Sequence, residues 1–452
     1  MDQKSQLARL GLFDARVPRY TSYPAAPQFS AAIGPAETGG WLEAVPEGAQ
    51  ISLYVHVPFC RRLCWFCACR TQGTRSMEPV AAYLRLLEAE LAIVAARLPA
   101  GVRLARLHWG GGTPTILDAA MIAQLAGRIT AVLPLAPGAE FSVEVDPTDC
   151  GPRRLEALAA AGMTRASVGV QDFDPQIQQA IGRVQSFGTT RAVIGQLRAL
   201  GVKSLSADIL FGLPQQTPAR LTASVQKLLS LSPDRVAVLG YAHVPWMARR
   251  QGMIRTDQLP TPEARLDLFE TARRLFRWDG YREIGIDHFA RPEDGLAQAE
   301  GAGRLRRSFQ GYTDDPAEVL IGIGASAISR FPQGYAQNAS ATSDYARAVT
   351  AGRLATAQGH AFAGEDVLRG TLIEALMCDF RISRAAVLAR FGAAAADRLD
   401  QLMDAAEAAF PGLLSRTAQG LAIPPQARPL TRMIARSFDA YAVHPAGHSP
   451  AV

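Results

Sequence analysis

Short apolar segments and amphipathic segments alternate along the chain from residue 51 to about residue 330. The short segments are rich in β-branched and aromatic residues, and they read "ISLYVHVPF", "RLARLHW", "EFSVEVDP", "RASVGV", "SLSADILFGLP", "RVAVLGYAHV" and "YREIGIDHFA". The segments between them carry apolar residues at a spacing of three to four, which is typical of helices. They span 80–98, 118–133, 153–161, 189–200, 219–231 and 263–276. The pattern predicts strands joined by helices.

This alternation favours a parallel sheet. The predicted strands end in glycine, proline or polar residues, in "HVPFC", "WGGGTPT", "EVDP", "GVQDF", "GLPQQ" and "AHVP". Active sites of βα barrels lie at the C-terminal ends of the strands, where these residues gather. The dinucleotide-binding pattern G-x-G-x-x-G does not follow the first strand, which argues against a doubly wound sheet. We therefore predict an α/β fold, a partial TIM-like (β/α)6 barrel over 51–335.

The two ends of the chain differ from this pattern. Residues 1–50 are polar and rich in Pro and Gly, and they predict an N-terminal extension. After residue 360, "GEDVLRGTLIEALMCDF", "RAAVLARFG" and "AAADRLDQLMDAAEAA" predict consecutive helices, and "GLLSRTAQGLAIPP" predicts a hairpin. We expect a mainly helical, winged-helix-like domain over 360–440, which does not by itself indicate DNA binding. A linker is expected at 335–360.

Composition and charge exclude several classes of function. Of the 452 residues, 48% are hydrophobic and 19% are charged, so the chain can bury a large core. The net charge of +6 comes from scattered arginines, and without a basic stripe we expect no nucleic-acid partner. The charge is compatible with an acidic small-molecule substrate. No apolar run reaches the about 20 residues of a membrane span, and the N-terminus lacks a secretory signal. We expect a cytoplasmic protein with no membrane partner.

Four of the six cysteines lie in ten residues, "CRRLCWFCAC". Closely spaced thiols in a reducing compartment indicate metal or redox chemistry rather than disulfides. Structural zinc sites usually combine two separated pairs of ligands, whereas iron–sulfur clusters are held by cysteines of one loop. The spacing favours an iron–sulfur cluster over zinc and over unliganded thiols.

The first three cysteines form the signature C-x3-C-x2-C of the radical S-adenosylmethionine (radical SAM) superfamily. In that family Cys60, Cys64 and Cys67 would bind three irons of a [4Fe–4S] cluster, and the fourth iron would bind S-adenosylmethionine. Because a fourth thiolate would close the open iron, we assign Cys69 a role other than ligand. An aromatic residue before the third cysteine packs near the adenine in the superfamily, which suggests Phe66. Its alternative is ordinary loop packing.

The segment "WGGGTPT" follows the second predicted strand. Consecutive glycines remove side chains where a ligand must touch the backbone. This segment, with Gly111, Gly112 and Thr113, resembles the part of the superfamily that meets the methionine amino group. The alternative is a tight turn between strand and helix.

Polar residues in other strand ends are candidates for binding the same ligands. Glu144 and Asp208 are carboxylates within apolar strands, where burial is costly unless they are paired. Each could bind ribose hydroxyls or an ammonium group, or could cap neighbouring backbone. Gln171 adds a donor and an acceptor. Arg183 is suited to binding a carboxylate, unless it is a solvated helix residue.

An ordered set of motifs resembles the family of oxygen-independent coproporphyrinogen III oxidases. It comprises "RYTSYP", "LYVHVPFCRRLCWFCACR", "WGGGTPT", "VEVDP", "SVGVQDF", "DILFGLP", "YAHVP", "GIDHFARP", "SFQGYT" and "GIGASAIS". The resemblance runs from about residue 15 to 380. It implies oxidative decarboxylation of two propionates of coproporphyrinogen III to vinyl groups, giving protoporphyrinogen IX. A 5′-deoxyadenosyl radical would remove hydrogen from the unactivated β-carbon, and the cofactors would supply this chemistry.

The resemblance also implies site residues and a second S-adenosylmethionine. The first S-adenosylmethionine would contact Tyr54, Gly111, Glu144 and Ile328. The second would contact Phe66, Gly112, Thr113, Gln171, Arg183, Asp208 and Ala242. The catalytic residues are expected to be Tyr54, Glu144, Phe309 and Gln310. One departure is Arg306-Arg307-Ser308, where the family often has His-Arg-Asn.

Further expectations concern the partners and the alternatives. A low-potential electron donor of the flavodoxin or ferredoxin type would reduce the cluster, and we expect a monomer. The N-terminal "RYTSYP" would cover the barrel mouth and shield the radical from water. One alternative is a haem-binding chaperone of the same superfamily. Another is a zinc-stabilised nucleic-acid-binding protein, which would bind DNA with a steep salt dependence.

Overall fold

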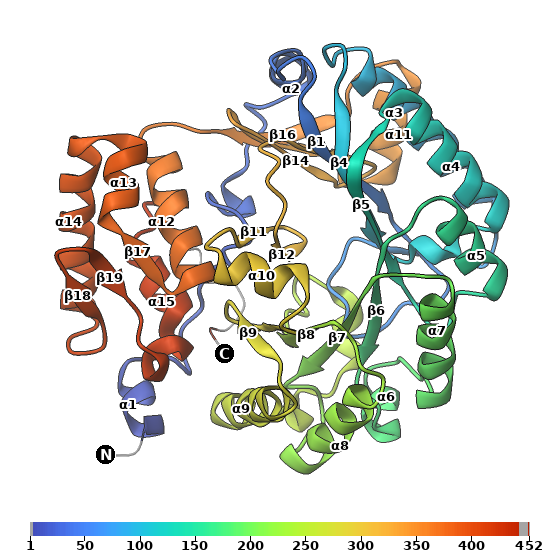
Figure 1. The fold of residues 1–452 in the computed structure, drawn as a ribbon. Helices are drawn as coiled ribbons and strands as arrows, with labels where there is room; N and C mark the ends of the chain where they lie inside the picture. Colours follow the sequence, from blue (N-terminus) through green and yellow to red (C-terminus); the bar gives the residue numbers. More distant parts are fainter. Residues whose placement is uncertain (1–2, 443–450, 452) are drawn as a thin grey trace.

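The computed structural model describes residues 3–442 and 451, and its centre is a curved, twelve-stranded mixed sheet (Figure 1). The strand order is β16-β15-β14-β13-β1-β4-β5-β6-β7-β8-β10-β9. Six consecutive parallel strands form the predicted partial barrel: β1 (Gln50–Val57), β4 (Arg103–Gly111), β5 (Leu135–Val145), β6 (Arg165–Gln171), β7 (Ser204–Phe211) and β8 (Arg235–Gly240). The predicted fold class is confirmed.

Helices cover the outer face of this sheet (Figure 1). They are α3 (Glu78–Ala95), α4 (Ala119–Val132), α5 (Pro152–Ala160), α6 (Pro175–Ala180), α7 (Phe187–Ala199), α8 (Pro218–Leu229) and α9 (Pro262–Trp278). The side chains of Asp118, Ser186, Thr217 and Thr261 accept a backbone hydrogen bond at the first turns of α4, α7, α8 and α9. Such N-caps fix where the helices begin. All six helices predicted between the strands are found, and of the seven helices named here only the short α6 was not predicted.

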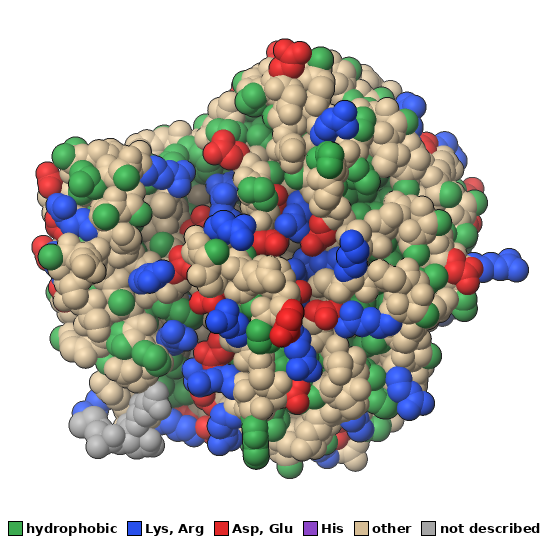
Figure 2. Space-filling view, in the orientation of Figure 1, with side chains coloured by type: hydrophobic (Ala, Val, Ile, Leu, Met, Phe, Trp, Pro, Cys, Tyr) green, Lys and Arg blue, Asp and Glu red, His purple; other side chains and the backbone are tan. Residues whose placement is uncertain are grey.

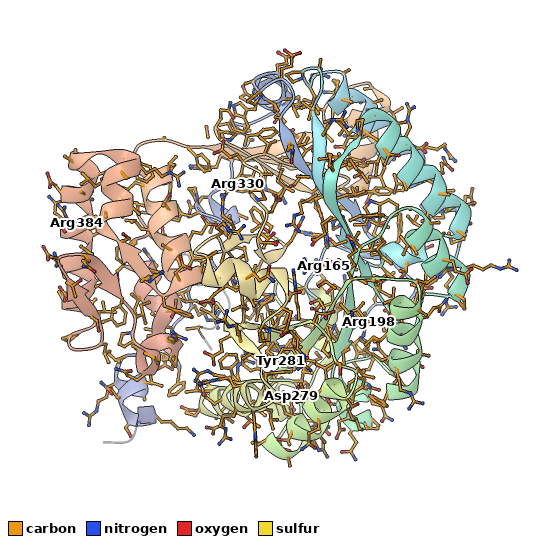
Figure 3. All side chains as sticks on the ribbon, viewed as in Figure 1. Arg165, Arg198, Asp279, Tyr281, Arg330 and Arg384 are labelled. Atoms are coloured by element: carbon orange, nitrogen blue, oxygen red, sulfur yellow. The ribbon has the colours of Figure 1, made fainter. Side chains whose placement is uncertain are left out.

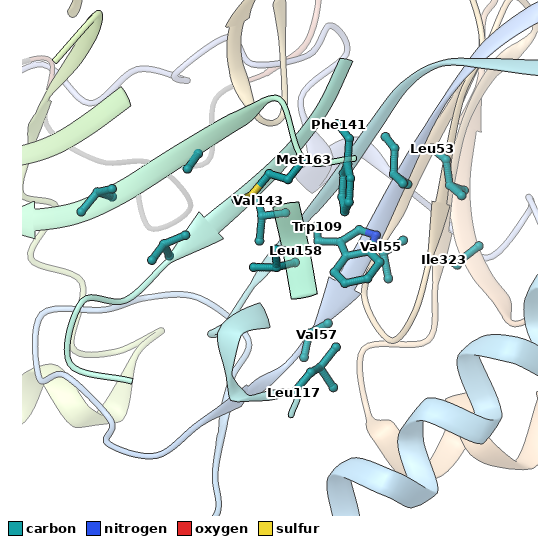
Figure 4. Packing of buried hydrophobic residues seen from close by; sticks show 14 of the residues in the cluster. Leu53, Val55, Val57, Trp109, Leu117, Phe141, Val143, Leu158, Met163 and Ile323 are labelled. Atoms are coloured by element: carbon teal, nitrogen blue, oxygen red, sulfur yellow. The ribbon is translucent and has the colours of Figure 1, made fainter. Parts of the chain in front are cut away.

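The side chains of each strand alternate between two faces, since their period is two residues. On β1, Leu53, Val55 and Val57 are buried toward the helices. With Trp109 and Phe141 of the next two strands they form the core seen in Figure 4. The intervening positions face the barrel interior, and they are largely polar. The fold therefore separates an apolar outer core from a polar interior.

Two segments differ from the prediction. Residues 281–290 form two short antiparallel strands, β9 (Arg282–Ile284) and β10 (His288–Ala290), rather than one strand. Gly285 has a φ of 56°, a left-handed conformation that turns the chain between them. The predicted linker 335–360 is also wrong. It forms β15 (Gly334–Asn338), α11 (Thr342–Thr350) and β16 (Thr356–Ala361), which extend the sheet beyond β13 (Leu320–Ile323) and β14 (Ile328–Phe331).

The remaining elements flank the barrel. The N-terminal segment contains α1 (Gln3–Arg9) and α2 (Pro35–Glu43), and α10 (Gly295–Gly301), β11 (Arg306–Ser308) and β12 (Gly311–Thr313) follow β10. The C-terminal part contains α12 (Asp366–Asp379), β17 (Arg381–Ser383), α13 (Arg384–Phe391), α14 (Ala393–Ala409), β18 (Ser415–Thr417), β19 (Gly420–Ala422) and α15 (Thr431–Arg436). Its helices and three-stranded sheet confirm the predicted helices and hairpin. Within the described part of the chain, no helix is long and apolar enough to span a membrane.

Glu90 of α3 joins three elements at the β1 side of the barrel. Its buried carboxylate accepts hydrogen bonds from the Gly324 amide (2.7 Å), the Asn338 amide group (2.6 Å) and the Tyr345 hydroxyl (2.7 Å). These partners follow β13, end β15 and lie in α11, so one carboxylate positions the extension of the sheet. Burial raises the pKa of Glu90 to about 7.

A pH-dependent stability difference should follow from this carboxylate. The pKa of Glu90 in the folded state lies above the ordinary 4.5. The protonated side chain therefore stabilises the fold fully below pH 4.5, and this stabilisation is lost as the pH rises through 7. In the wild type, this loss lowers the free energy of unfolding between about pH 5 and 8. We expect that decrease to be about 2 kcal/mol smaller in Glu90→Gln. Urea denaturation of both proteins measures it. Parallel pH profiles would contradict the assignment.

Candidate active site

Charge pairs occupy the amino-terminal end of the barrel. Arg106 forms an ion pair with Glu140 (2.7 Å), Arg165 pairs with the same carboxylate (3.3 Å), and Arg235 pairs with Asp294 (2.6 Å). Figure 3 shows Arg165 near the centre of the barrel. Buried charges are stable only when paired, and these pairs fill this end. The opposite, carboxyl end carries the candidate site.

The four clustered cysteines lie on a loop after β1, at the carboxyl end of the barrel. The loop is closed by a two-residue parallel ladder of β2 (Phe59–Cys60) and β3 (Gln72–Gly73). The Gln72 amide donates to the Pro58 carbonyl (2.7 Å), and the Thr74 amide donates to the Cys60 carbonyl (3.0 Å). All six cysteines of the protein are free thiols. The loop is therefore a short, closed segment that presents thiols.

Each of the three predicted ligands has a hydrogen-bond donor at its sulfur. The Thr113 hydroxyl donates to Cys60 (3.6 Å), Arg183 donates to Cys64 (3.5 Å), and the Cys69 amide donates to Cys67 (3.4 Å). A hydrogen bond from the Cys69 side chain lowers the pKa of Cys67 to about 6. Donors of this kind stabilise thiolate sulfur, as iron–sulfur ligation requires.

The donor set at this loop fits an iron–sulfur cluster. Cys60, Cys64 and Cys67 are free thiols on one short loop. A [4Fe–4S] cluster presents a different iron to each thiolate, and such clusters are held by closely spaced cysteines of one loop.

The glycine segment at the end of β4 lies directly against this loop. A Cβ on Gly112 would lie 2.7 Å from the Phe59 carbonyl oxygen, beside Cys60. Gly111 has a φ of 112°, and its amide donates to the Glu144 carboxylate (3.0 Å). A Cβ on Gly110 would lie 2.7 Å from the same carboxylate. Close approach of backbone to the loop and to Glu144 requires glycine at these positions.

Two histidines that the sequence analysis did not single out complete this part of the interior. Tyr54 hydrogen-bonds His56 (3.0 Å) and stacks on His108 (ring centroids 5.7 Å apart), whose Nε2 lies 3.5 Å from Glu144. Burial raises the pKa of Glu144, but the hydrogen bond from His108 and the Gly111 amide leave it lowered overall. Glu144 is therefore ionised at neutral pH. Burial lowers the pKa of His56, which favours the neutral imidazole.

Three other predicted residues come from the next two strands and the segment between them: Gln171 ends β6, Arg183 follows α6, and Asp208 lies within β7. Arg183 is buried rather than solvated, and it binds Asp146 (3.1 Å) and the Gly169 carbonyl (3.0 Å) as well as Cys64. Gln171 ends β6 with a left-handed φ of 68°. Ser167 donates to Asp208 (3.0 Å), and burial raises the pKa of Asp208 to about 6.

Phe66 and Ala242 are joined by a residue that the sequence did not reveal. The fully buried Gln251 donates to the Phe66 carbonyl (2.7 Å) and to the Ala242 carbonyl (3.0 Å). It therefore ties the cysteine loop to the segment after β8. A backbone polar contact of this kind leaves no pattern in the sequence.

The other predicted residues come from the sheet extension and the β11–β12 hairpin. Gly322 lies opposite Tyr54 in the β13–β1 pairing, and a Cβ on it would lie 2.6 Å from the Ile328 carbonyl. Phe309 packs on Tyr335 (5.7 Å) and on Phe29 of the N-terminal segment (6.5 Å). Gln310 is exposed in the hairpin. Their roles in binding or catalysis stay predictions.

Replacing single cysteines tests the ligand set. We expect Cys60→Ser, Cys64→Ser and Cys67→Ser to lose the iron–sulfur absorbance near 400 nm after anaerobic reconstitution, because serine is a poor cluster ligand. The matched controls Cys69→Ser and Cys150→Ser should retain it. Loss of iron in Cys69→Ser would instead make that thiol a fourth ligand.

The two glycines Gly112 and Gly127 form a matched pair. Gly112→Ala should lower the affinity for S-adenosylmethionine at least 10-fold, because its methyl group would collide with the Phe59 carbonyl. Gly127→Ala adds a methyl to α4, where nothing lies within 4 Å, and should stabilise the protein by about 0.5–1 kcal/mol. Equilibrium binding measures the affinity of both variants for S-adenosylmethionine, and thermal melting measures their stability. Equal affinities in both variants would show that the glycine segment does not shape the ligand site.

Comparison with known proteins agrees with this geometry. A family model described as the Radical SAM superfamily matches residues 54–228, and one described as the HemN C-terminal domain matches residues 362–430. The solved structure of coproporphyrinogen III oxidase (HemN) from Escherichia coli, a radical SAM enzyme, superposes on this chain with a TM-score of 0.90 at 35% identity. The superposition covers 95% of this chain and 100% of the Escherichia coli chain. The radical SAM fold and its cofactors, the [4Fe–4S] cluster and S-adenosylmethionine, are thereby confirmed.

Relatives that match over nearly the whole chain show the family to which it belongs. The oxygen-independent coproporphyrinogen III oxidase of Paracoccus denitrificans is 60% identical over 452 residues, which is 100% of both chains. The oxidase of the same name from Escherichia coli is 37% identical and covers 96% of this chain and 95% of its own length. These relatives favour the oxidase over the haem-chaperone alternative. The chain belongs to the oxygen-independent coproporphyrinogen III oxidase family of the radical SAM superfamily.

Proposed function

We propose that this protein oxidatively decarboxylates two propionate side chains of coproporphyrinogen III to vinyl groups, giving protoporphyrinogen IX. One observation carries the proposal: the thiol loop, the glycine segment and the ionised Glu144 meet at the carboxyl end of the barrel. The names of the full-length relatives supply the substrate class.

The cofactors supply the reactive chemistry when they are bound, namely a 5′-deoxyadenosyl radical able to remove hydrogen from an unactivated carbon. The residues of the chain bind and orient. We infer that Cys60, Cys64 and Cys67 hold the cluster, while Glu144 and the backbone of Gly111 hold the polar end of S-adenosylmethionine. Tyr54 keeps His108 in place beside Glu144 by stacking on it.

A second S-adenosylmethionine would lie farther along the strand ends. The proposal places Phe66, Gly112, Thr113, Gln171, Arg183, Asp208 and Ala242 around it, and Ile328 beside the first molecule. The contacts of Gln251 with Phe66 and Ala242 support a shared pocket for these two residues. Phe309 and Gln310 would lie at the substrate, under the N-terminal segment that packs on Phe309.

The partners follow from the chemistry. We propose that a low-potential protein of the flavodoxin or ferredoxin type reduces the cluster, and that the protein works as a monomer in the cytoplasm. Segment 1–50 would cover the substrate over the 51–335 barrel, and the 360–440 domain would pack against it without binding nucleic acid.

Anaerobic turnover tests this function directly. The reconstituted protein, given dithionite, S-adenosylmethionine and coproporphyrinogen III, should form protoporphyrinogen IX together with 5′-deoxyadenosine and CO2. Glu144→Gln should lower kcat/KM at least 100-fold, because it removes the charge at the cofactor end of the site. Haem uptake without a vinyl product would contradict the proposal and favour the chaperone alternative.

A further inference from the structure

A cavity of about 650 Å³ lies beside the cysteine loop. Its wall combines the loop residues 67–72, most of the segment 244–250 that follows β8, and parts of the chain just before β14 and at the start of α11. Cys67, a proposed ligand of the cluster, lies in this wall, whereas the residues assigned to the two S-adenosylmethionine molecules do not. The cavity therefore adjoins the cluster site without being part of the proposed S-adenosylmethionine sites.

The charged side chains in this wall are all basic. Arg70, Arg249 and Arg250 line the cavity, and no Asp or Glu of the described residues does. Arg250 donates to the carbonyls of Cys69 (3.3 Å) and Thr71 (3.3 Å), so its guanidinium is held against the cysteine loop. On the face of the molecule that Figure 2 shows, basic and acidic side chains instead lie side by side. A wall with one sign of charge attracts a partner of the opposite sign.

Exposed apolar side chains gather around the same loop. Of the eight large apolar side chains that are exposed among the described residues, five come from the loop, the segment after α6 or the segment after β8, namely Leu63, Val184, Trp246, Met247 and Met253. Trp246, with Arg16 over its ring, and Met247 line the cavity and are 51% and 63% exposed. Arg62 of the loop donates to the Val184 carbonyl (3.2 Å). Apolar groups exposed together and surrounded by charge mark contact sites for other proteins.

The position of this surface favours a protein that carries electrons. Reduction of the cluster transfers one electron from a reduced carrier to the oxidised cluster, and no atom or proton has to move with it. Electron transfer between proteins weakens steeply with distance, so a carrier must dock close to the cluster ligands. A protein docked over this cavity would approach the cluster through its ligand Cys67. A second copy of the chain on the same face would bring arginine against arginine, which is unfavourable.

We propose that Arg70, Arg249 and Arg250, with Trp246 and Met247 beside them, form the docking surface for an acidic one-electron carrier protein that reduces the cluster. This inference rests on the proposed function, and it adds the place where the carrier binds and the charge that the carrier must have. Carboxylates of the carrier would pair with Arg70 and Arg249, whose side chains are exposed, and its apolar surface would cover Met247.

Two reductants separate docking from chemistry. The reconstituted protein, given S-adenosylmethionine and coproporphyrinogen III, is reduced either by dithionite, a small ion that needs no docking surface, or by a purified acidic flavodoxin that has been reduced photochemically. The rate of 5′-deoxyadenosine formation is measured. We expect Arg70→Glu and Arg249→Glu, tested separately, each to lower kcat/KM for flavodoxin about 10-fold, because each replaces an attraction by a repulsion. Their rates with dithionite should stay within about 2-fold of the wild-type rate, and Arg249→Lys should keep most of the flavodoxin-dependent rate.

Arg128→Glu is the matched control. Arg128 is exposed on α4, which covers the outer face of the barrel, so the same change of charge there should leave both rates unchanged. Added salt should slow the flavodoxin-dependent reaction of the wild type more than that of Arg249→Glu, because salt screens the attraction.

Three results would overturn the docking surface. The first is an unchanged flavodoxin-dependent rate in Arg70→Glu or Arg249→Glu, including a case in which only the oligomeric state of the variant changes. The second is an equal loss of rate with both reductants, which would place these arginines at the cluster rather than in docking. The third is a wild type that dithionite reduces and flavodoxin does not. Absent turnover of the wild type with both reductants would instead contradict the proposed function.

Discussion

The hydrogen bond from the Gly111 amide to Glu144 is the contact on which the site depends. It joins the ends of β4 and β5 inside the barrel, and it holds the glycine segment in a left-handed turn that only glycine adopts readily. The next glycine then rests against the Phe59 carbonyl, one residue before the first cysteine of the loop. These contacts connect β1, β4 and β5 at their carboxyl ends. The thiols, the backbone amides and the Glu144 carboxylate lie at the same end of the barrel.

The parts outside the barrel complete this arrangement by covering it. The N-terminal segment packs its Phe29 on Phe309 and places Arg19 against the carbonyl that ends β8. The C-terminal part contributes Arg432 to the same region. A cavity beside the end of β8 is thus lined by Arg19, Arg265 and Arg432, which come from three distant regions of the chain. These covering elements are suited to excluding water from the reactive end of the barrel.

The sequence predicted the main architecture because a period of two along strands and of three to four along helices reflects burial directly. The cysteine loop and the glycine segment were predictable because their chemistry depends on local spacing. The pattern at 281–290 predicts one strand rather than two because the turn between β9 and β10 contains a single glycine, Gly285. Residues 335–360 show no clear period because β15 and β16 have only five and six residues, so the sequence pattern predicts a linker there.

Residues that act through long-range contacts were not predictable. His56 and His108 become part of the site only because the strand register brings them to Tyr54 and Glu144. Gln251 is a polar residue in a loop, and its role depends on two backbone carbonyls far apart in the chain. The cavity beside the end of β8 is likewise lined by residues 19, 265 and 432, which are far apart in the sequence. Such groupings require the three-dimensional structure.

The most direct measurement of the central claim is the electron paramagnetic resonance spectrum of the reduced, reconstituted protein, recorded before and after addition of S-adenosylmethionine. If the three thiolates leave one iron open to this ligand, its binding must change the g-values of the cluster signal. A spectrum that stays the same at saturating S-adenosylmethionine, or an iron-free protein with no signal, would contradict the account.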